Sequence, residues 1–141
     1  MFKQEYACDA FFNFEPMKKT ILVVDDFASI RDYVCDTLNR KGYLTIPASN
    51  GNEAYDMLVK KKDEINLVLT DFNMPVCNGF ELLKMIRTEQ SISSTPVVFL
   101  TTESNPDKMR AAKDAGLSAW IKKPYKPETF FAQIENALKH G

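Results

Sequence analysis

Charge of one sign is not in excess in this sequence, which has 18 Lys and Arg against 19 Asp and Glu in 141 residues. Without a strong electrostatic field, neither nucleic acid nor an anionic membrane surface is an expected partner. Long hydrophobic runs are also lacking, so no segment has the length needed for a secretory signal or a membrane span. We therefore expect a cytoplasmic protein whose length suits a single domain with its own core.

Cysteine and histidine are scarce as well. Cys8, Cys35 and Cys77 form no C-x-x-C pair. An odd number of cysteines without a secretory signal indicates reduced thiols in a cytosol, and we interpret the three as small apolar fillers. The single histidine, His140, lies at the end of the last expected helix and is not expected to be catalytic.

Five short apolar runs recur along the chain, and a helical pattern follows each of them. The runs are ILVVD (21–25), LTIPA (44–48), NLVLT (66–70), PVVFL (96–100) and AWIK (119–122). After the first run, Ile30, Val34 and Leu38 recur four residues apart, which predicts a helix with one apolar face. Near-continuous apolar strands that alternate with helices are typical of a parallel sheet covered on both faces. The sequence therefore predicts an α/β domain.

The first 18 residues stand outside this alternation. They contain an aromatic cluster, Phe11, Phe12 and Phe14, which we interpret as a packed flap or a disordered arm. The expected domain organisation is therefore an N-terminal extension over residues 1–18, followed by one domain over residues 19–141.

Three carboxylates follow two of the expected strands. Asp25 and Asp26 end the first apolar run, and Asp71 follows the third in LTDFNMP. In an open α/β sheet, a site forms beyond the carboxyl ends of the strands, so these side chains are expected to meet. Adjacent carboxylates repel one another unless a cation neutralises them. An all-oxygen site without nearby His or Cys suits Mg²⁺ better than zinc, so the sequence predicts a magnesium site.

The fourth and fifth strands also end in polar residues, Thr101 with Thr102 and Lys122 with Lys123. A metal ion, an ammonium group and a hydroxyl around one carboxylate would form a cradle for a phosphoryl group. Asp71 is then the expected nucleophile, which would form an aspartyl phosphate. Each residue alone is typical of a helix cap or a turn, but their joint occurrence at four strand ends favours a functional site.

Four motifs, VVDD (23–26), TDFNMPVCNGFEL (70–82), FLTTE (99–103) and KKPY (122–125), occur in an order and spacing that resembles the receiver domain of two-component response regulators. The resemblance covers about residues 18–140. It implies a doubly wound, flavodoxin-like fold with strand order 2-1-3-4-5. It also implies that the chain accepts a phosphoryl group from a phosphohistidine on a sensor histidine kinase or a histidine phosphotransfer protein. The chain would then signal to a downstream protein.

The resemblance assigns roles to the acidic residues by position. Asp71 would be the phosphoacceptor, and Asp25 and Asp26 would form the acidic pair that holds Mg²⁺. Asn73 would bind the metal ion through its backbone carbonyl. The resemblance thus implies a switch that catalyses only its own phosphorylation and dephosphorylation, and not an enzyme that acts on other substrates.

Thr101 resembles the switch hydroxyl that bonds a phosphoryl oxygen, and Lys123 resembles the lysine that pairs with the phosphate. The bond between Lys123 and Pro124 is expected to be cis by the same resemblance. Trp120 occupies the position of the aromatic switch residue, which turns inward on activation. We therefore expect its ring to be exposed at the end of the fifth strand in the unphosphorylated protein.

Two residues depart from the family pattern. Thr102 replaces the Ala or Gly that commonly follows the switch hydroxyl, and its bulk predicts narrower access for a phosphodonor or water. Trp120 replaces the usual Tyr or Phe, so its inward position is expected to be incomplete or more costly. Met109 and Tyr125 are candidates for the surface that changes on activation, although a core position is the simpler interpretation of Met109.

Three alternatives remain at this point. A Mg²⁺-dependent phosphohydrolase with an aspartyl-phosphate intermediate would want a second Asp two residues after the nucleophile, where the sequence has Asn73. A flavodoxin-like cofactor carrier would want a phosphate-binding loop rich in Ser, Thr or Gly after the first strand, where the sequence has DDFASIRD. A docking module of the same fold that is never phosphorylated would not need all five pocket residues, which are Asp25, Asp26, Asp71, Thr101 and Lys123.

Overall fold

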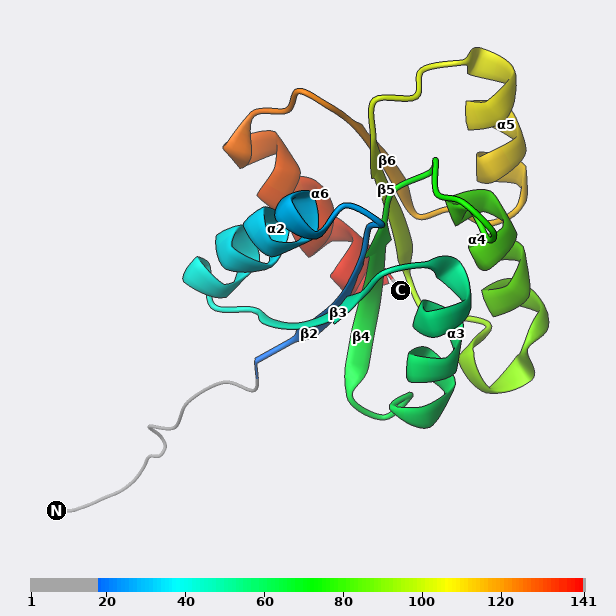
Figure 1. The fold of residues 1–141 in the computed structure, drawn as a ribbon, viewed down its shortest axis with the longest axis horizontal. Coiled ribbons are helices and arrows are strands. Elements are labelled where there is room, and N and C mark those ends of the chain that lie inside the picture. Colours follow the sequence, from blue (N-terminus) through cyan, green and yellow to red (C-terminus); the bar gives the residue numbers. More distant parts are fainter. Residues whose placement is uncertain (1–17, 141) are drawn as a thin grey trace, which may run out of the picture.

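The computed structural model describes residues 18–140, and its five strands form one parallel sheet (Figure 1). The strands are β2 (Thr20–Val24), β3 (Leu44–Ala48), β4 (Ile65–Thr70), β5 (Val97–Thr101) and β6 (Ala119–Lys122). They lie in the order β3-β2-β4-β5-β6, and every neighbouring pair is parallel. The expected order 2-1-3-4-5 is therefore confirmed. The aromatic cluster at residues 11–14 and Cys8 lie outside the described residues.

Helices cover both faces of the sheet. They are α2 (Ala28–Arg40), α3 (Gly51–Lys60), α4 (Gly79–Thr88), α5 (Pro106–Asp114) and α6 (Pro127–His140), with a short 3₁₀ helix η1 (Gln90–Ile92) after α4. Figure 1 shows α2 and α6 on one face and α3, α4 and α5 on the other. Such a doubly covered parallel sheet is the architecture that near-continuous apolar strands predict.

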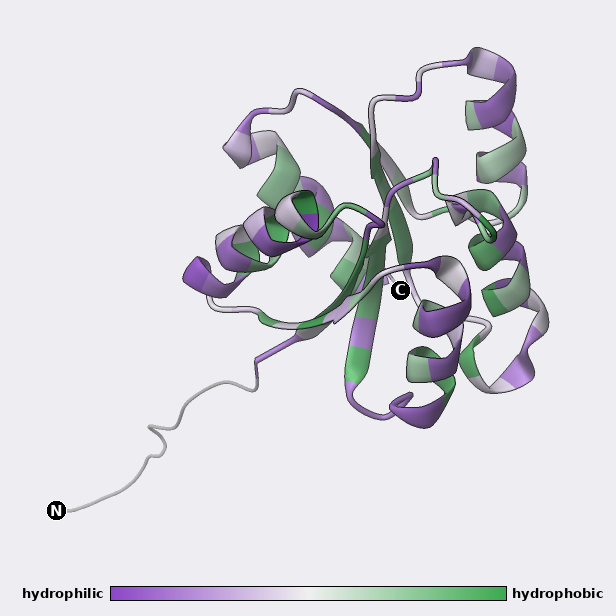
Figure 2. Ribbon diagram, in the orientation of Figure 1, coloured by the Kyte–Doolittle hydropathy of each residue, from purple (hydrophilic) through white to green (hydrophobic). Residues whose placement is uncertain are grey.

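The core has two layers because successive side chains of a strand point to opposite faces. Ile21 and Val23 pack in a buried cluster with α2 and α6, whereas Leu22 and Val24 pack in a second cluster with α3 and α4. Figure 2 accordingly shows the central strands as hydrophobic, while each helix carries hydrophilic residues on part of its surface. The two layers hold the strands rigidly and so fix the positions of the residues at their ends.

Side-chain caps set the start of three helices. Asn50, Asn78 and Asn105 each accept a hydrogen bond from a backbone N–H in the first turn of α3, α4 and α5, respectively. At α4 the cap is reciprocal, because the Glu81 side chain accepts from the Asn78 N–H. Helix α2 differs, since Phe27 stands at its N-cap position and makes no side-chain cap bond. This helix begins directly at the acidic pair.

Each predicted strand lies within one residue of an observed one, but two side chains differ from expectation. Ile30 shares the predicted spacing of Val34 and Leu38, yet it is 36% exposed. Met109 is 38% exposed, so the interpretation as a core residue is wrong. Of the two cysteines in the described part, Cys77 is buried and Cys35 is half-buried, and both are free thiols.

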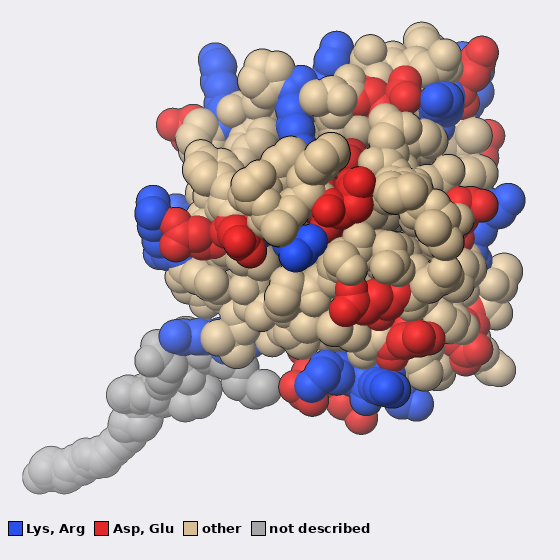
Figure 3. All heavy atoms as spheres, in the orientation of Figure 1, with Lys and Arg blue, Asp and Glu red and all other residues tan. Residues whose placement is uncertain are grey.

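On the face seen in Figure 3, acidic and basic side chains of the described residues are mixed over the surface, in agreement with the balanced composition. Within residues 18–140, no helix combines the length and the apolar character needed to cross a bilayer.

Candidate functional site

The central strands bring three carboxylates together at one edge of the sheet. Asp25 follows β2 and Asp71 follows β4, and these neighbouring strands continue their pairing through the Asp71 N–H, which donates to the Val24 carbonyl at 3.1 Å. Asp26 is the next residue after Asp25. Each of the three offers a carboxylate oxygen, and these oxygens all lie within 4.8 Å of one another. The predicted acidic cluster is therefore present in the fold.

Burial makes this cluster electrostatically costly. Asp25 is buried, and loss of solvation raises the pKa of its carboxyl, to which the nearby charges of Asp71 and Asp26 add. Two groups oppose the rise in pKa: the Phe27 N–H, which donates to Asp25 Oδ1 at 3.0 Å, and the ammonium of Lys123. The net effect is still a raised pKa, so a cation bound here would relieve an electrostatic penalty on the charged form.

One carboxylate oxygen in the cluster has no partner. Asp26 Oδ1 is buried, and no hydrogen-bond donor of the described residues reaches it. Buried polar atoms in proteins nearly always have a partner, and an exception calls for an explanation such as an ion. The donor set consists of carboxylate oxygen atoms, which suit Mg²⁺. The residues present therefore fit the expected ion.

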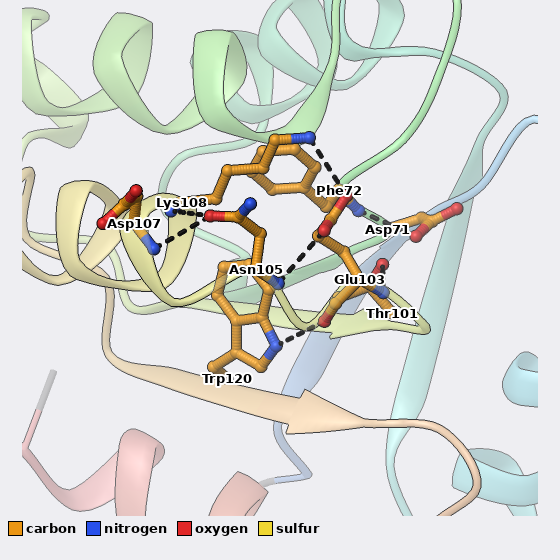
Figure 4. Close-up of polar contacts among 8 residues, drawn as sticks. All are labelled: Asp71, Phe72, Thr101, Glu103, Asn105, Asp107, Lys108 and Trp120. Atoms are coloured by element: carbon orange, nitrogen blue, oxygen red, sulfur yellow. Dashed lines mark hydrogen bonds and ion pairs between the residues drawn. The ribbon is translucent and has the colours of Figure 1, made fainter.

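Asp71 is held in a defined orientation. Its Oδ1 accepts a hydrogen bond from the Phe72 N–H at 2.8 Å (Figure 4). The start of α4 packs against the backbone here so closely that a Cβ on Gly79 would collide with the Asp71 carbonyl oxygen. Sequence reasoning missed this role of Gly79. Only glycine permits this approach of helix and acidic loop.

The polar ends of β5 and β6 reach the same edge. Thr101 is the last residue of β5 and is completely buried, and its hydroxyl accepts the Glu103 N–H at 3.1 Å. Lys123 follows β6, and its N–H donates to the Thr101 carbonyl at 2.9 Å. The peptide bond from Lys123 to Pro124 is cis, as the family resemblance implies. Asn73 lies exposed two residues after Asp71.

Trp120 differs from its expected position. The ring is half-buried between Phe72 and Phe99, with ring centroids 5.6 and 5.4 Å away. Its indole Nε1 donates to the Glu103 carbonyl at 3.2 Å (Figure 4). The expectation of an exposed ring is therefore wrong. The physical reason is that two neighbouring rings form an apolar slot, and the rim of that slot supplies an acceptor for the indole N–H.

The loop between β5 and α5 contains an ion pair that sequence reasoning missed. Lys108 Nζ lies 3.1 Å from Glu103 Oε1 and 5.4 Å from the centre of the Phe72 ring. This ion pair and a hydrogen bond from the Asn105 N–H lower the pKa of the Glu103 carboxyl. The two residues are five apart and only Lys108 lies within α5, so the usual helical pair spacing of three or four could not reveal them.

A groove of about 300 Å³ opens beside the site. It is lined by residues of α2, of β5 and of the segment after β6, namely Ser29, Ile30, Tyr33, Val34, Leu100, Lys123 and Tyr125. On the same helix or next to it, Tyr33 is 65% exposed and Phe27 is 61% exposed. Large exposed apolar side chains beside a polar site are typical of a protein-binding surface.

Comparisons with known proteins agree with this geometry. The response regulator receiver domain family matches residues 21–135. The chain is 36% identical over 122 residues to the chemotaxis protein CheY homolog of Campylobacter jejuni, covering 86% of this chain and 93% of that protein. It is 35% identical over 120 residues to chemotaxis protein CheY-3 of Vibrio cholerae, covering 84% and 91%.

Solved structures give the same result. The chemotaxis protein CheY4 of Vibrio cholerae superimposes with a TM-score of 0.79 at 36% sequence identity, over 86% of this chain and 99% of that one. A response regulator receiver domain protein from Clostridium thermocellum also has a TM-score of 0.79, at 26% identity. The fold, the acidic cluster of Asp25, Asp26 and Asp71, and the matched length all agree, and the chain belongs to the response regulator receiver domain family, as a CheY-type receiver domain.

Proposed function

We propose that Asp71 accepts a phosphoryl group from a phosphohistidine and that the chain acts as a phosphorylation-controlled switch. The observation that carries this proposal is the acidic cluster, where three carboxylates meet and one buried oxygen of Asp26 has no partner. Neither a helix cap nor a turn requires such an arrangement. A site for a cation and a phosphoryl group does, because both would neutralise charge that burial makes costly.

The acidic residues would hold the metal ion in this proposal. Asp25, Asp26 and Asp71 would supply carboxylate oxygens, and Asn73 would supply its backbone carbonyl. When bound, Mg²⁺ supplies positive charge that neutralises the carboxylates and the phosphoryl oxygens. Lys123 adds a second positive charge, since its ammonium lies close enough to Asp25 to lower the pKa of that carboxyl.

Asp71 would act as the nucleophile. Its Oδ1 is engaged by the Phe72 N–H, which leaves Oδ2 to attack phosphorus. A bond then forms between Oδ2 and phosphorus while the bond from phosphorus to the donor imidazole nitrogen breaks, and the imidazole takes up a proton. Thr101 can bond the transferred group, because a hydroxyl that accepts from the Glu103 N–H still has a proton to donate. Lys123 would pair with the same group.

We further propose that the donor docks beside the site on α2. The groove that contains Lys123 is lined by Ile30 and Tyr33, and Phe27 lies exposed at the start of the helix. An apolar surface next to the phosphoacceptor fits a sensor histidine kinase or a histidine phosphotransfer protein, which must bring a histidine within reach of Asp71. A downstream protein would bind elsewhere.

The proposal also excludes a phosphohydrolase that acts on other substrates. A phosphohydrolase would need an acid two residues after Asp71, and Asn73 cannot take that role. We therefore propose a switch whose only chemistry is its own phosphorylation and dephosphorylation. We propose that the receiver domain spans residues 19–141 behind an extension at residues 1–18. A cytoplasmic location would suit the free thiols of Cys35 and Cys77.

Labelling by a small phosphodonor tests this function. Acetyl phosphate with Mg²⁺ should phosphorylate the purified chain, because the described residues complete the cradle without a residue from a kinase. Peptide mapping should place the label on Asp71, Asp71→Asn should abolish it, and the exposed-site control Asp56→Asn should keep it. Undiminished labelling of Asp71→Asn at another residue would overturn the proposal. A panel of purified histidine kinases would then identify the donor by the rate of transfer.

A further inference from the structure

We propose that Arg31 is a positioning residue of the cation site, which fixes the direction of Asp26 through the main-chain carbonyl of Asp25. This role rests on the function proposed above, because it concerns the metal ion that the acidic cluster would hold. Arg31 itself would touch neither the ion nor the phosphoryl group. It would act through the backbone of the loop that carries both aspartates.

The start of α2 places the Arg31 side chain over the acidic loop. The Arg31 N–H donates to the Phe27 carbonyl at 2.9 Å, which closes the first turn of the helix. Side chains in a helix tilt toward its N-terminus, so a long side chain at this position points back to the residues before the helix. Arg31 Nη1 accordingly donates to the Asp25 carbonyl at 2.7 Å, six residues earlier. Arg31 is half-buried, so this bond is partly shielded from water.

Asp25 has a partner for its N–H, its carboxylate and its carbonyl. The N–H donates to the Ala48 carbonyl at 3.2 Å, and the carboxylate accepts the Phe27 N–H at 3.0 Å. Arg31 supplies the donor for the carbonyl. Since Phe27 at the N-cap position makes no side-chain cap bond, these contacts with Asp25 tie the start of α2 to the end of β2.

The direction of Asp26 depends on the same carbonyl. The carbonyl of Asp25 and the N–H and Cα of Asp26 lie in one planar peptide group. A donor that holds this carbonyl therefore fixes the plane from which the Asp26 side chain projects. Asp26 Oδ1 is buried without a hydrogen-bond partner among the described residues, so no contact of its own holds this oxygen in place. Its position therefore depends on the main chain to which Arg31 bonds.

The guanidinium also lies near the start of α3. Glu53 is in the first turn of that helix, where hydrogen bonds from Ser49 lower the pKa of the Glu53 carboxyl and the nearby charge of Arg31 adds to the decrease. A charged donor makes a stronger hydrogen bond to a carbonyl than a neutral donor does. The carboxylates of the cluster repel one another without a cation. A strong bond to the backbone of their loop would therefore oppose their separation.

The charge of Arg31 alone predicts the opposite effect on the ion. A guanidinium near the site repels a divalent cation, so its removal would strengthen Mg²⁺ binding if charge were its only action. Loss of the bond to the Asp25 carbonyl would instead loosen the loop and weaken binding. The direction of the change in affinity therefore separates the two actions.

Isothermal titration calorimetry with Mg²⁺ tests this role on the full chain, without phosphorylation. Arg31→Met keeps a long side chain without a donor, and it should weaken Mg²⁺ binding about 10-fold, as the loss of a residue that supports metal ligands typically does. Arg31→Lys should keep the affinity within about threefold of the wild type, because a lysine ammonium can replace the single bond to the carbonyl.

Arg40→Met is the matched control for the loss of a positive charge from α2. Arg40 lies at the other end of the helix, where it is exposed and pairs with Asp36. Its substitution should leave the affinity for Mg²⁺ unchanged. Titration well below the melting temperature of each variant, measured in EDTA, separates weaker binding from loss of the fold.

Equal or tighter binding of Mg²⁺ by Arg31→Met than by the wild type would overturn the role of Arg31. An equal loss in Arg31→Lys and Arg31→Met would overturn it as well. The ratio of the affinities of wild type and Arg31→Met should persist at high salt, because it arises from geometry and not from charge. No binding of Mg²⁺ by the wild type would overturn the proposed function itself, so the two failures are distinguishable.

Discussion

The two halves of the site differ in how completely the protein satisfies its own polar groups. In the half built by β2 and β4, Asp25 is buried with a raised carboxyl pKa and Asp26 Oδ1 has no partner. In the half built by β5 and β6, the Thr101 hydroxyl and the Trp120 indole each have a hydrogen-bond partner. The two halves lie side by side in the sheet, because β4 pairs with β5.

This difference separates the half of the site that needs a cation from the half that is ordered without one. Buried polar groups without partners cost free energy, so the acidic half is most stable when a cation completes it. The half with Trp120 has partners for its polar groups instead, so it is ordered without a ligand. The comparison indicates that ligand binding is concentrated at the ends of β2 and β4. The following predictions test it, in order of decreasing effect.

The largest effect is expected from removal of the unpartnered carboxylate. Asp26→Ala should weaken Mg²⁺ binding by more than about 10-fold, because the loss of a direct ligand should exceed the loss of a residue that only supports ligands. Isothermal titration calorimetry of the wild type and the variant measures the ratio. Asp56→Ala, at an exposed position of α3, should leave the affinity unchanged. Equal affinities in all three proteins would mean that the ion does not bind at Asp26.

A smaller effect is expected on stability without metal. The folded state raises the pKa of Asp25, so between the unfolded and folded pKa values it binds more protons than the unfolded state. Stability without Mg²⁺ therefore falls as the pH rises through that interval, and the full penalty is present above the folded pKa. Asp25→Asn should remove the penalty and raise the melting temperature by about 2 to 4 °C at a pH above that interval.

This stabilisation by Asp25→Asn should disappear at low pH, where the wild-type carboxyl is protonated as well. Asp56→Asn serves as the control for a general loss of negative charge and should change the melting temperature little. Thermal denaturation in EDTA over a range of pH values measures all three proteins. A lower melting temperature for Asp25→Asn at a pH above that interval would show that its charge stabilises the metal-free fold, contrary to the comparison.

Thr102 lies exposed beside the buried Thr101, and its bulk is expected to narrow access to the site. Thr102→Ala should accelerate phosphorylation by acetyl phosphate, or spontaneous dephosphorylation, about three- to fivefold, roughly 1 kcal/mol of activation free energy. The rates can be followed by intact-protein mass spectrometry. Thr102→Ser is the control that keeps a hydroxyl and removes only a methyl group. Unchanged rates in Thr102→Ala would remove the steric hypothesis.

The sequence predicted most of the fold because its strands are short apolar runs, each followed by a helical pattern. Their ends placed Asp25, Asp71 and Thr101 at one edge, and the family resemblance supplied their roles. Trp120 was predicted wrongly, because its position depends on contacts with Phe72 and on a carbonyl in a different loop. No periodic pattern contains such tertiary contacts.

Helical spacing also predicted the burial of Ile30 wrongly, and the reason is local. The residue has the spacing of the buried face of α2, but it lines the open groove beside Lys123 and so stays partly exposed. Position along a helix predicts which residues share a face. It does not predict how far the neighbouring elements extend over that face.

The smallest effect is expected in the loop that joins Asp71 to α4. Val76 has a φ of 70°, in the left-handed region that β-branched residues rarely adopt, and its side chain is 87% exposed. Its Cβ costs about 1 kcal/mol there, and a glycine would lose about 0.5 kcal/mol through greater freedom of the unfolded chain. Val76→Gly should therefore stabilise the fold by about 0.5 kcal/mol. Val76→Ala is the matched control, because it keeps the Cβ and with it the strain.

Urea denaturation of the wild type and both variants measures these differences through the midpoint at constant slope. Val76→Ala should match the wild type, since an exposed side chain loses little packing when it is shortened. A gain in Val76→Gly alone would show that the acidic half carries backbone strain as well as electrostatic cost, which would sharpen the contrast with the satisfied half around Trp120. Equal stability of the glycine and alanine variants would instead confine the difference between the two halves to their polar groups.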